Sequence, residues 1–525
     1  MYLILSIISG FFLFLTRQTI IVMSRLIEYD LKNEIYAHYQ KLDFSFYKKN
    51  ATGDLMNRIS EDVSQVRMYL GPGIMYTINL CALSAMVIYQ MISINSWLTL
   101  FVLIPLPIMS FLIYFVSSKM NFLSKEVQKE QSMMSTIVQE TFAGIRVIKT
   151  YNREKEMHEK FAESASNYKI KSMALVLVNA FFMPTIVFLI GLSTILSIYL
   201  GGLMTFDSTI SLGGILAFIF FVNKLTWPFA SIGWVTSINQ RAAASQSRIN
   251  EFLQTEPEIQ NPTSAAFEFK GRIVFDKVSY TYKNSGIQAI KDVSFSIEPG
   301  QTFAVIGRTG SGKSTLLHLL MRQLDPDSGK IEIDGQDLKT INLEKFRDSA
   351  GVVPQEVFLF SDSIENNLKF GCTHNVTEGE MQSAAIKAHV HHNIVDFPNQ
   401  YQTLLGERGV NLSGGQKQRI SIARALLRKP KLLLLDDCLS AVDTETEERI
   451  LSNLKKEGKN NTTVIVSHRI SSIRNADRIM VIENGVSIEE GTHEELLALN
   501  GHYTKLYQQQ LAEDQAKDLD NKLEE

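Results

Sequence analysis

Long apolar runs alternate with charged stretches over the first half of this chain. Five runs are about 20 residues long, enough to cross the roughly 30 Å hydrocarbon core of a bilayer as helices. They lie near residues 2–23, 73–92, 98–117, 176–200 and 212–234. A buried helix of a soluble domain explains one such run but not five in one half of a chain. The pattern therefore predicts an α-helical transmembrane domain over residues 1–250.

The stretches between the apolar runs differ in charge. Residues 24–72 and 118–175 are rich in Lys and Arg, whereas residues 93–97 and 201–211 contain neither. Because cytoplasmic loops carry the excess of basic residues, the two long stretches are predicted to be cytoplasmic. We expect a multi-pass protein of the cell membrane (plasma or inner), with the part of the chain that follows the last span in the cytoplasm.

Both long stretches have helical patterning rather than loop chemistry. Short amphipathic segments broken near a glycine occur within residues 42–66 and 135–161. Polar helices that extend from a bilayer need a surface to end on, so we expect them to contact a soluble domain of this chain or of a partner chain. Solvated coil is the alternative.

After residue 267 the pattern changes to short apolar strands that alternate with helices, which is typical of an α/β domain. We assign residues 251–267 to a linker, residues 268–505 to this domain and residues 506–525 to a charged tail. A net charge of -3 does not favour nucleic acid as a partner. The 3 cysteines lack metal-type spacing, and their odd number argues against a disulfide framework.

A glycine-rich loop follows the apolar strand TFAVIG and precedes a helix. Gly307 to Ser314 satisfies the pattern G-x-x-x-x-G-K-[ST]. Such a loop wraps phosphates with backbone N–H groups, its Lys meets the terminal phosphates, and its hydroxyl ligates Mg²⁺. The sequence therefore predicts ATP and Mg²⁺ as ligands, with Lys313 on the phosphates and Ser314 on the metal.

Two further segments carry candidate chemistry. The run Leu432–Leu435 reads as a buried parallel strand, and Asp436 at its end would supply the second magnesium ligand. The block from Asn411 to Leu426 places Ser413, with two glycines after it, just before a helix, where backbone amides can hold another anion. One phosphate does not need two cradles, so we expect this second one to face the nucleotide of another copy of the domain. A plain helix cap is the simpler alternative.

Together these motifs resemble an ABC exporter half-transporter, with fused transmembrane and nucleotide-binding domains, over essentially the full chain. The resemblance implies a type IV exporter-like membrane domain followed by a P-loop ABC ATPase, and a second half-transporter as partner. It implies an ATP-binding loop of Gly307, Arg308, Thr309, Gly310, Ser311, Gly312, Lys313, Ser314 and Thr315. It implies a signature segment of Leu412, Ser413, Gly414, Gly415 and Gln416, which contacts ATP in trans.

The resemblance also assigns single residues. Tyr282 matches the aromatic residue that stacks on adenine, and Gln355 matches the glutamine that joins Mg²⁺ to the membrane-loop contact. His468 matches the switch histidine. Ser440 to Asp443 resembles the D-loop. One departure is length: such half-transporters usually carry six spans, and the first span recognised here resembles the family's second. We therefore expect that the first span and its outer loop are absent, by truncation or a misassigned start.

A second departure is Asp437, which stands where the family has the glutamate that polarises the attacking water. Aspartate shortens the reach by about 1.5 Å, and a misplacement of about 1 Å can cost about 100-fold in rate. We therefore expect this site to bind ATP normally and to hydrolyse it slowly. The intact signature can complete another site, which favours a different partner chain with a full glutamate. An aspartate that works adequately in a homodimer remains the alternative.

The resemblance implies ATP-driven export of drugs or other amphipathic molecules by a heterodimer. A homodimeric lipid flippase is the second hypothesis, and an ATP-gated channel or regulator is the third. The chain has no long regulatory insert, which argues against the third. Apolar helices give no chemical code for one cargo, so the transported molecule is left open. The expected partners are a second half-transporter, the transported molecule and the membrane lipid around the apolar helices.

Overall fold

The computed structural model describes residues 1–206, 209–283, 285–457 and 461–512. The chain divides into two compact units. We call the first the helical unit, formed by Met1–Lys41 and Ala51–Glu256, and the second the α/β unit, formed by Leu42–Asn50 and residues from Pro257 onward. A short piece of the first predicted cytoplasmic stretch thus belongs to the α/β unit.

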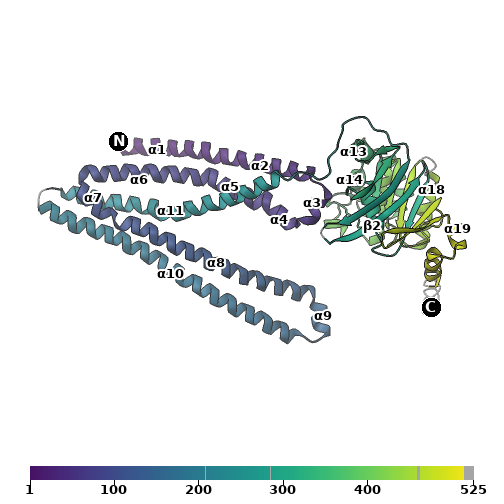
Figure 1. Ribbon diagram of the computed structural model, residues 1–525. Coiled ribbons are helices and arrows are strands. Elements are labelled where there is room, and N and C mark those ends of the chain that lie inside the picture. Colours follow the sequence, from purple (N-terminus) through teal and green to yellow (C-terminus); the bar gives the residue numbers. More distant parts are fainter. Residues whose placement is uncertain (207–208, 284, 458–460, 513–525) are drawn as a thin grey trace. The chain divides into compact units, whose positions relative to one another are not determined.

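The helical unit consists of helices that continue into one another through short π-helical turns and tight bends (Figure 1). Its elements are α1 (Tyr2–Thr16), η1 (Arg17–Ile21), α2 (Val22–Lys41), α4 (Thr52–Asn57), η2 (Arg58–Asp62), α5 (Val63–Met68), η3 (Tyr69–Gly73), α6 (Ile74–Ile94), α7 (Ser96–Leu103), α8 (Pro105–Ala143), α9 (Ile145–Thr150), α10 (Glu154–Phe206) and α11 (Leu212–Leu253).

Within the described residues, five continuous helical stretches are long and apolar enough to cross a membrane. They are Tyr2–Lys41, Thr52–Ile94, Ser96–Ala143, Glu154–Phe206 and Leu212–Leu253. Each contains one of the predicted spans and extends beyond it into polar sequence, because the amphipathic segments continue the helices. The five predicted apolar runs thus lie in five helices of membrane-spanning length.

The helical unit has its own apolar core, where α6, α7, α8, α10 and α11 pack against one another. Met91, Leu98, Leu106 and Phe218 are fully buried in it. By contrast, α1 buries no residue in this chain. Helix packing in this unit is therefore densest between the later spans.

Labelling of introduced cysteines tests the predicted orientation. Ser96 and Ser135 are both exposed and lie at the start of α7 and within α8. In a Cys81→Ala background, which removes the exposed native thiol, an impermeant maleimide should label Ser96→Cys in intact cells. It should label Ser135→Cys only after permeabilisation, because the basic stretches are predicted to be cytoplasmic. Labelling of Ser135→Cys alone in intact cells would reverse the topology.

The α/β unit contains two sheets and a group of helices. Its elements are α3 (Phe44–Lys49), β1 (Ile273–Tyr282), β2 (Ile287–Ile297), β3 (Thr302–Ile306), α12 (Lys313–Leu320), β4 (Ser328–Ile333), β5 (Gln336–Asp337), α13 (Leu343–Asp348), β6 (Ala350–Val353), α14 (Ile364–Lys369), α15 (Glu378–Lys387), α16 (His391–Val395), η4 (Gln400–Gln402), η5 (Glu407–Gly409), α17 (Gly414–Leu427), β7 (Leu432–Asp436), α18 (Thr444–Glu457), β8 (Thr462–Ser467), β9 (Arg478–Glu483), β10 (Val486–Gly491) and α19 (His493–Ala498). A last helix covers residues 502–512.

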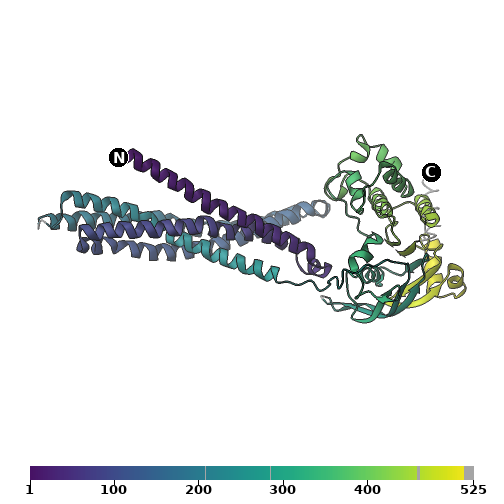
Figure 2. The same ribbon diagram turned by 90° about the horizontal axis from the view of Figure 1, so that it is seen from above.

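The larger sheet has the strand order β10-β9-β3-β8-β7-β6, and its strands from β9 to β6 run parallel. Leu432–Leu435 of β7 is buried along its whole length, as the leucine run predicts for a central parallel strand. The smaller sheet, β2-β1-β4-β5, is antiparallel. Figure 2 shows the green helices between residues 364 and 427 gathered at one side of this unit.

Candidate nucleotide-binding site

Parallel pairing brings three sequence-distant segments to one edge of the larger sheet. β8 lies between β3 and β7, with Ile306 beside Ser467 and Asp436 beside Val466. The loop after β3, the residues that end β7 and the loop after β8 therefore meet at the carboxyl ends of the strands. This edge is where open α/β sheets bind their ligands.

The loop between β3 and α12 has two positions that exclude a side chain. A Cβ on Gly307 would lie 2.2 Å from the Ile482 carbonyl oxygen. At Gly312, φ is +104° and a Cβ would lie 2.3 Å from the Ala289 carbonyl oxygen. Both glycines are required by close backbone approach, and the loop leads into α12 with the helix N-terminus at the carboxyl edge of the sheet.

Lys313 is held by its own loop. Its ammonium donates to the carbonyl oxygens of Gly307 at 2.8 Å and Arg308 at 2.9 Å. Burial lowers the pKa of Lys313, and the nearby carboxylates of Asp437 and Asp436 oppose that shift. The cation is thus positioned beside the loop that would carry phosphate, on partners that a phosphate oxygen can replace.

Ser314 and Asp436 lie together, with the Ser314 hydroxyl donating to the Asp436 carboxylate at 2.9 Å. Burial raises the pKa of Asp436, and the hydrogen bond from Ser314 lowers it in opposition. Gln355, in the loop after β6, lines the same cavity. Mg²⁺ in phosphate-handling enzymes takes one or two carboxylates together with water and substrate oxygens, and this donor set fits it.

Asp437 is bound by His468. The imidazole Nδ1 lies 2.8 Å from Oδ1 and 2.9 Å from Oδ2 of the carboxylate. The Asp437 backbone has φ +45° and donates to the Val466 carbonyl oxygen at 2.8 Å. Aspartate and asparagine tolerate this left-handed conformation better than most residues, so the local backbone offers one physical reason for aspartate here.

A cavity of about 410 Å³ lies at this edge. Most of the predicted ATP-binding and catalytic residues line it: Tyr282, Thr309, Gly310, Gly312, Lys313, Ser314, Thr315, Gln355, Asp436, Asp437 and His468. Gly307, Arg308 and Ser311 belong to the same loop. The carbonyl groups of Gly307 and Arg308 accept from the Lys313 ammonium, and the Ser311 carbonyl accepts from the backbone N–H of Gly485.

The cavity has a further wall that sequence reasoning missed. It is formed by residues of β2 and of the β9–β10 turn: Ile287, Gln288, Ala289, Lys291, Asn484 and Gly485. These positions belong to no motif, and a backbone hydrogen bond from Lys291 to Gly485 joins the two segments. Only the tertiary structure brings them to the phosphate loop.

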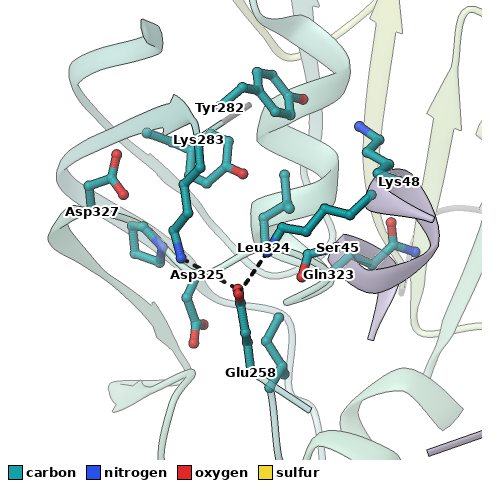
Figure 3. A pocket seen from close by; sticks show the side chains of 13 residues that line it. Ser45, Lys48, Glu258, Tyr282, Lys283, Gln323, Leu324, Asp325 and Asp327 are labelled. Atoms are coloured by element: carbon teal, nitrogen blue, oxygen red, sulfur yellow. Dashed lines mark hydrogen bonds and ion pairs between the residues drawn. The ribbon is translucent and has the colours of Figure 1, made fainter. Parts of the chain in front are cut away.

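Tyr282 has contacts on two sides. Its hydroxyl lies 3.1 Å from the Thr315 hydroxyl, and the Lys48 ammonium lies 4.8 Å from the centre of its ring. Figure 3 shows Lys48 and Tyr282 at a neighbouring cavity of about 500 Å³, where Glu258 pairs with Lys283. The residue expected to stack on adenine therefore also contacts α3.

Two other contacts fix α3 to the α/β unit. The Asp43 carboxylate caps α3 and also accepts from the backbone N–H groups of Glu258 and Ile259. The Phe44 ring stacks on His318 of α12, with 5.4 Å between the ring centres. A short helix from the first half of the sequence thus reaches the helix that begins at the phosphate loop.

The signature and D-loop residues do not line the cavity. Ser413 caps α17 in a reciprocal pair with Gln416, in which each side chain accepts from the other's backbone N–H. Leu412 is buried, and Cβ atoms on Gly414 and Gly415 would face Ala441 at 3.7 and 2.9 Å. Ser440 donates to the Asp437 carbonyl oxygen at 3.0 Å. Asp443 accepts from the Thr446 backbone at the start of α18.

A phosphate-type loop between β3 and α12, with the Asp436 carboxylate at the end of β7 in the same parallel sheet, defines a P-loop ATPase, here joined to helices of membrane-spanning length. Residues 1–229 match the family model of the ABC transporter transmembrane region, and residues 290–440 match the ABC transporter model. The chain belongs to the ABC exporters with fused transmembrane and ATP-binding domains. The predicted fold class and ATPase activity are confirmed.

Relatives in this family include proteins named for different cargoes. The chain is 37% identical over 489 residues to the probable multidrug resistance ABC transporter ATP-binding/permease protein YheI of Bacillus subtilis (strain 168). The alignment covers 93% of this chain and 83% of YheI. It is 36% identical to the multidrug resistance-like ATP-binding protein MdlA of Escherichia coli (strain K12), covering 92% and 82%. It is 31% identical to an ATP-dependent lipid A-core flippase of Alkalilimnicola ehrlichii, covering 95% and 84%.

A solved structure shares the fold. The structure of a bacterial Atm1-family ABC exporter with ATP bound superimposes with a TM-score of 0.78 and covers 93% of this chain and 86% of the other. The two sequences are 24% identical. The similarity extends over both units and supports the fold assignment.

Proposed function

We propose that this chain is one half of a heterodimeric ABC exporter, that its own ATP site is slow, and that the assembly exports drugs or other amphipathic molecules from the cell. The α/β unit would lie in the cytoplasm. The observation that carries the proposal is Asp437, which follows the magnesium-site aspartate and is bound by His468 through both carboxylate oxygens.

The position of Asp437 explains slow hydrolysis. A carboxylate that orients an attacking water has to reach the water in line with the terminal phosphate. Asp437 is shorter than glutamate by one carbon–carbon bond, about 1.5 Å. Its two oxygens already contact His468 within 2.9 Å. Binding of ATP does not depend on this reach, so the site would retain nucleotide while its turnover is low.

The other residues would act as follows. Loop amides and Lys313 hold the phosphates, and Tyr282 holds adenine. Ser314, Gln355 and Asp436 would hold Mg²⁺, which would supply charge stabilisation to the reaction. Asp437 orients water, and His468 orients Asp437. The Ser413 hydroxyl oxygen accepts from the Gln416 backbone N–H in its helix cap, so its O–H group is left to donate a hydrogen bond to a phosphate of ATP bound by the second chain.

Lipid is the second candidate cargo. A flippase among the relatives matches nearly the whole chain at 31% identity, close to the level of the multidrug-type relatives. Under that alternative, two copies of this chain would form the transporter and Asp437 would serve both sites. The two proposals therefore differ in the partner that is required for ATP turnover.

Substitution of Asp437 tests the slow-site proposal. In co-purified halves at saturating ATP, Asp437→Asn should lower steady-state ATPase turnover less than about threefold, because most flux passes through the partner's site. A glutamine in place of the partner's glutamate should lower turnover about 100-fold, the scale of losing one well-placed catalytic group. Asp437→Glu restores the reach and should raise turnover.

If Asp437→Asn abolishes turnover and the chain purifies only with itself, the site is an ordinary working one. The homodimeric alternative then replaces the heterodimer.

A further inference from the structure

The helix of residues 502–512 is firmly attached to the α/β unit at its beginning. The Glu489 carboxylate of β10 accepts from the backbone N–H groups of His502 and Tyr503. Tyr503 is fully buried, and its hydroxyl lies 2.7 Å from Nδ1 of His493. The Thr504 hydroxyl donates to the Leu496 carbonyl oxygen at 3.1 Å. The start of this helix is therefore fixed against β10 and α19.

Toward its other end the same helix reaches the loop after β8 through one side chain. The amide nitrogen of Gln510 donates to the His468 carbonyl oxygen at 2.6 Å. The amide oxygen of Gln510 accepts from the Ile470 backbone N–H at 2.8 Å. A carbonyl only accepts and an N–H only donates, so this amide orientation alone satisfies both groups. The Gln510 amide thus makes two hydrogen bonds to the backbone of this loop, one donated and one accepted.

The loop that Gln510 holds contains the candidate catalytic histidine. The His468 imidazole contacts the Asp437 carboxylate, and the His468 backbone carbonyl accepts from the Gln510 amide. Arg469 donates to the Ser440 carbonyl oxygen at 2.9 Å, so the loop also contacts the D-loop. Backbone displacement at residue 468 would move the imidazole relative to Asp437.

We propose that Gln510 is a positioning residue for ATP hydrolysis, acting through the backbone of His468, and that the helix of residues 502–512 is thereby part of the hydrolytic machinery. The inference rests on the roles proposed above for Asp437 and His468. The alternative is that Gln510 only attaches the helix to the α/β unit, which would affect stability and leave the chemical step unchanged.

Single-turnover hydrolysis separates the two roles. The full-length protein, with whichever chain co-purifies, is loaded with radiolabelled ATP, and conversion of bound ATP to ADP is followed after Mg²⁺ addition. The phase that His468→Ala removes reports this site. Gln510→Met keeps the side-chain length and removes both hydrogen bonds. Gln510→Glu keeps the bond from Ile470 and loses the one to His468. Gln509→Met is the matched control, since Gln509 is an exposed glutamine of the same helix.

We expect Gln510→Met and Gln510→Glu to slow this phase about tenfold, as partial misplacement of a catalytic group does. Their thermal midpoints and their affinities for ATP should stay equal to those of Gln509→Met. A rate equal to that of the control, or a loss that runs parallel to a lower thermal midpoint or ATP affinity, would overturn the positioning role. If His468→Ala leaves every phase unchanged, the site assignment under the proposed function fails first, and that result is distinct.

Discussion

Lys313→Ala should lower the affinity for ATP about 100-fold or more and abolish ATPase turnover. The ammonium is the point charge at the phosphate loop, and hydrogen bonds to charged groups contribute about 1.5–3 kcal/mol each. Without the half-buried positive charge beside Asp436 and Asp437, the phosphates would face these carboxylates unneutralised. Equilibrium binding of a fluorescent ATP analogue measures the affinity directly.

A second lysine of the same cavity provides the matched control. Lys291 also lines the 410 Å³ cavity, but it belongs to β2 and not to the phosphate loop itself. Lys291→Ala should therefore change the affinity only a few-fold. Lys313→Ala also removes the hydrogen bonds to the carbonyl groups of Gly307 and Arg308. The thermal midpoints of both variants show whether that loss destabilises the fold. Equal, unchanged binding by the two folded variants would refute the assignment of the phosphate site.

Ser413 gives the other large expected effect, because its two possible roles respond differently to substitution. As a helix cap, Ser413 is replaceable by aspartate, which caps about as well, whereas alanine costs about 1 kcal/mol. As a donor to a phosphate in trans, Ser413 is not replaceable by aspartate, since the carboxylate would repel the phosphate. Ser413→Asp should thus keep the thermal midpoint and lower turnover on the order of 100-fold, as does loss of one donor to a transition-state anion.

Steady-state ATPase of co-purified halves is the measurement, with Ser413→Asn as the neutral capping variant. Asparagine should also keep the fold and should lose less turnover than aspartate, because it adds no negative charge. Full activity of Ser413→Asp would leave α17 with a plain N-terminal cap and would remove the argument for a shared site.

Features with local causes were predictable from the sequence. The five apolar runs are the membrane-length helices, because length and apolarity alone decide whether a helix can span a bilayer. Lys313 lies at a strand-to-helix junction, as the glycine spacing predicts, because the loop requires glycine at positions 307 and 312. Asp436 follows a strand that is buried throughout, as its leucines require.

Features that depend on tertiary contacts were not predictable. Gln510 stands in a polar run, QQQ, where nothing separates it from its neighbours, and the boundary expected at residue 505 falls inside the helix of residues 502–512. The bonds from Gln510 to His468 and Ile470 join segments about 40 residues apart. The contact of Lys48 with Tyr282 spans an even longer separation, and no local pattern encodes either one.

The place of Leu42–Asn50 in the α/β unit has a consequence for building hybrid transporters. Both flanks of this segment belong to the helical unit, so the chain passes between units after Lys41, after Asn50 and after Glu256. A graft made at the last junction alone would set one parent's α3 against another parent's surface, where Asp43 and Phe44 have to meet their partners. A working hybrid therefore needs all three junctions, with Leu42–Asn50 taken from the same parent as the ATPase.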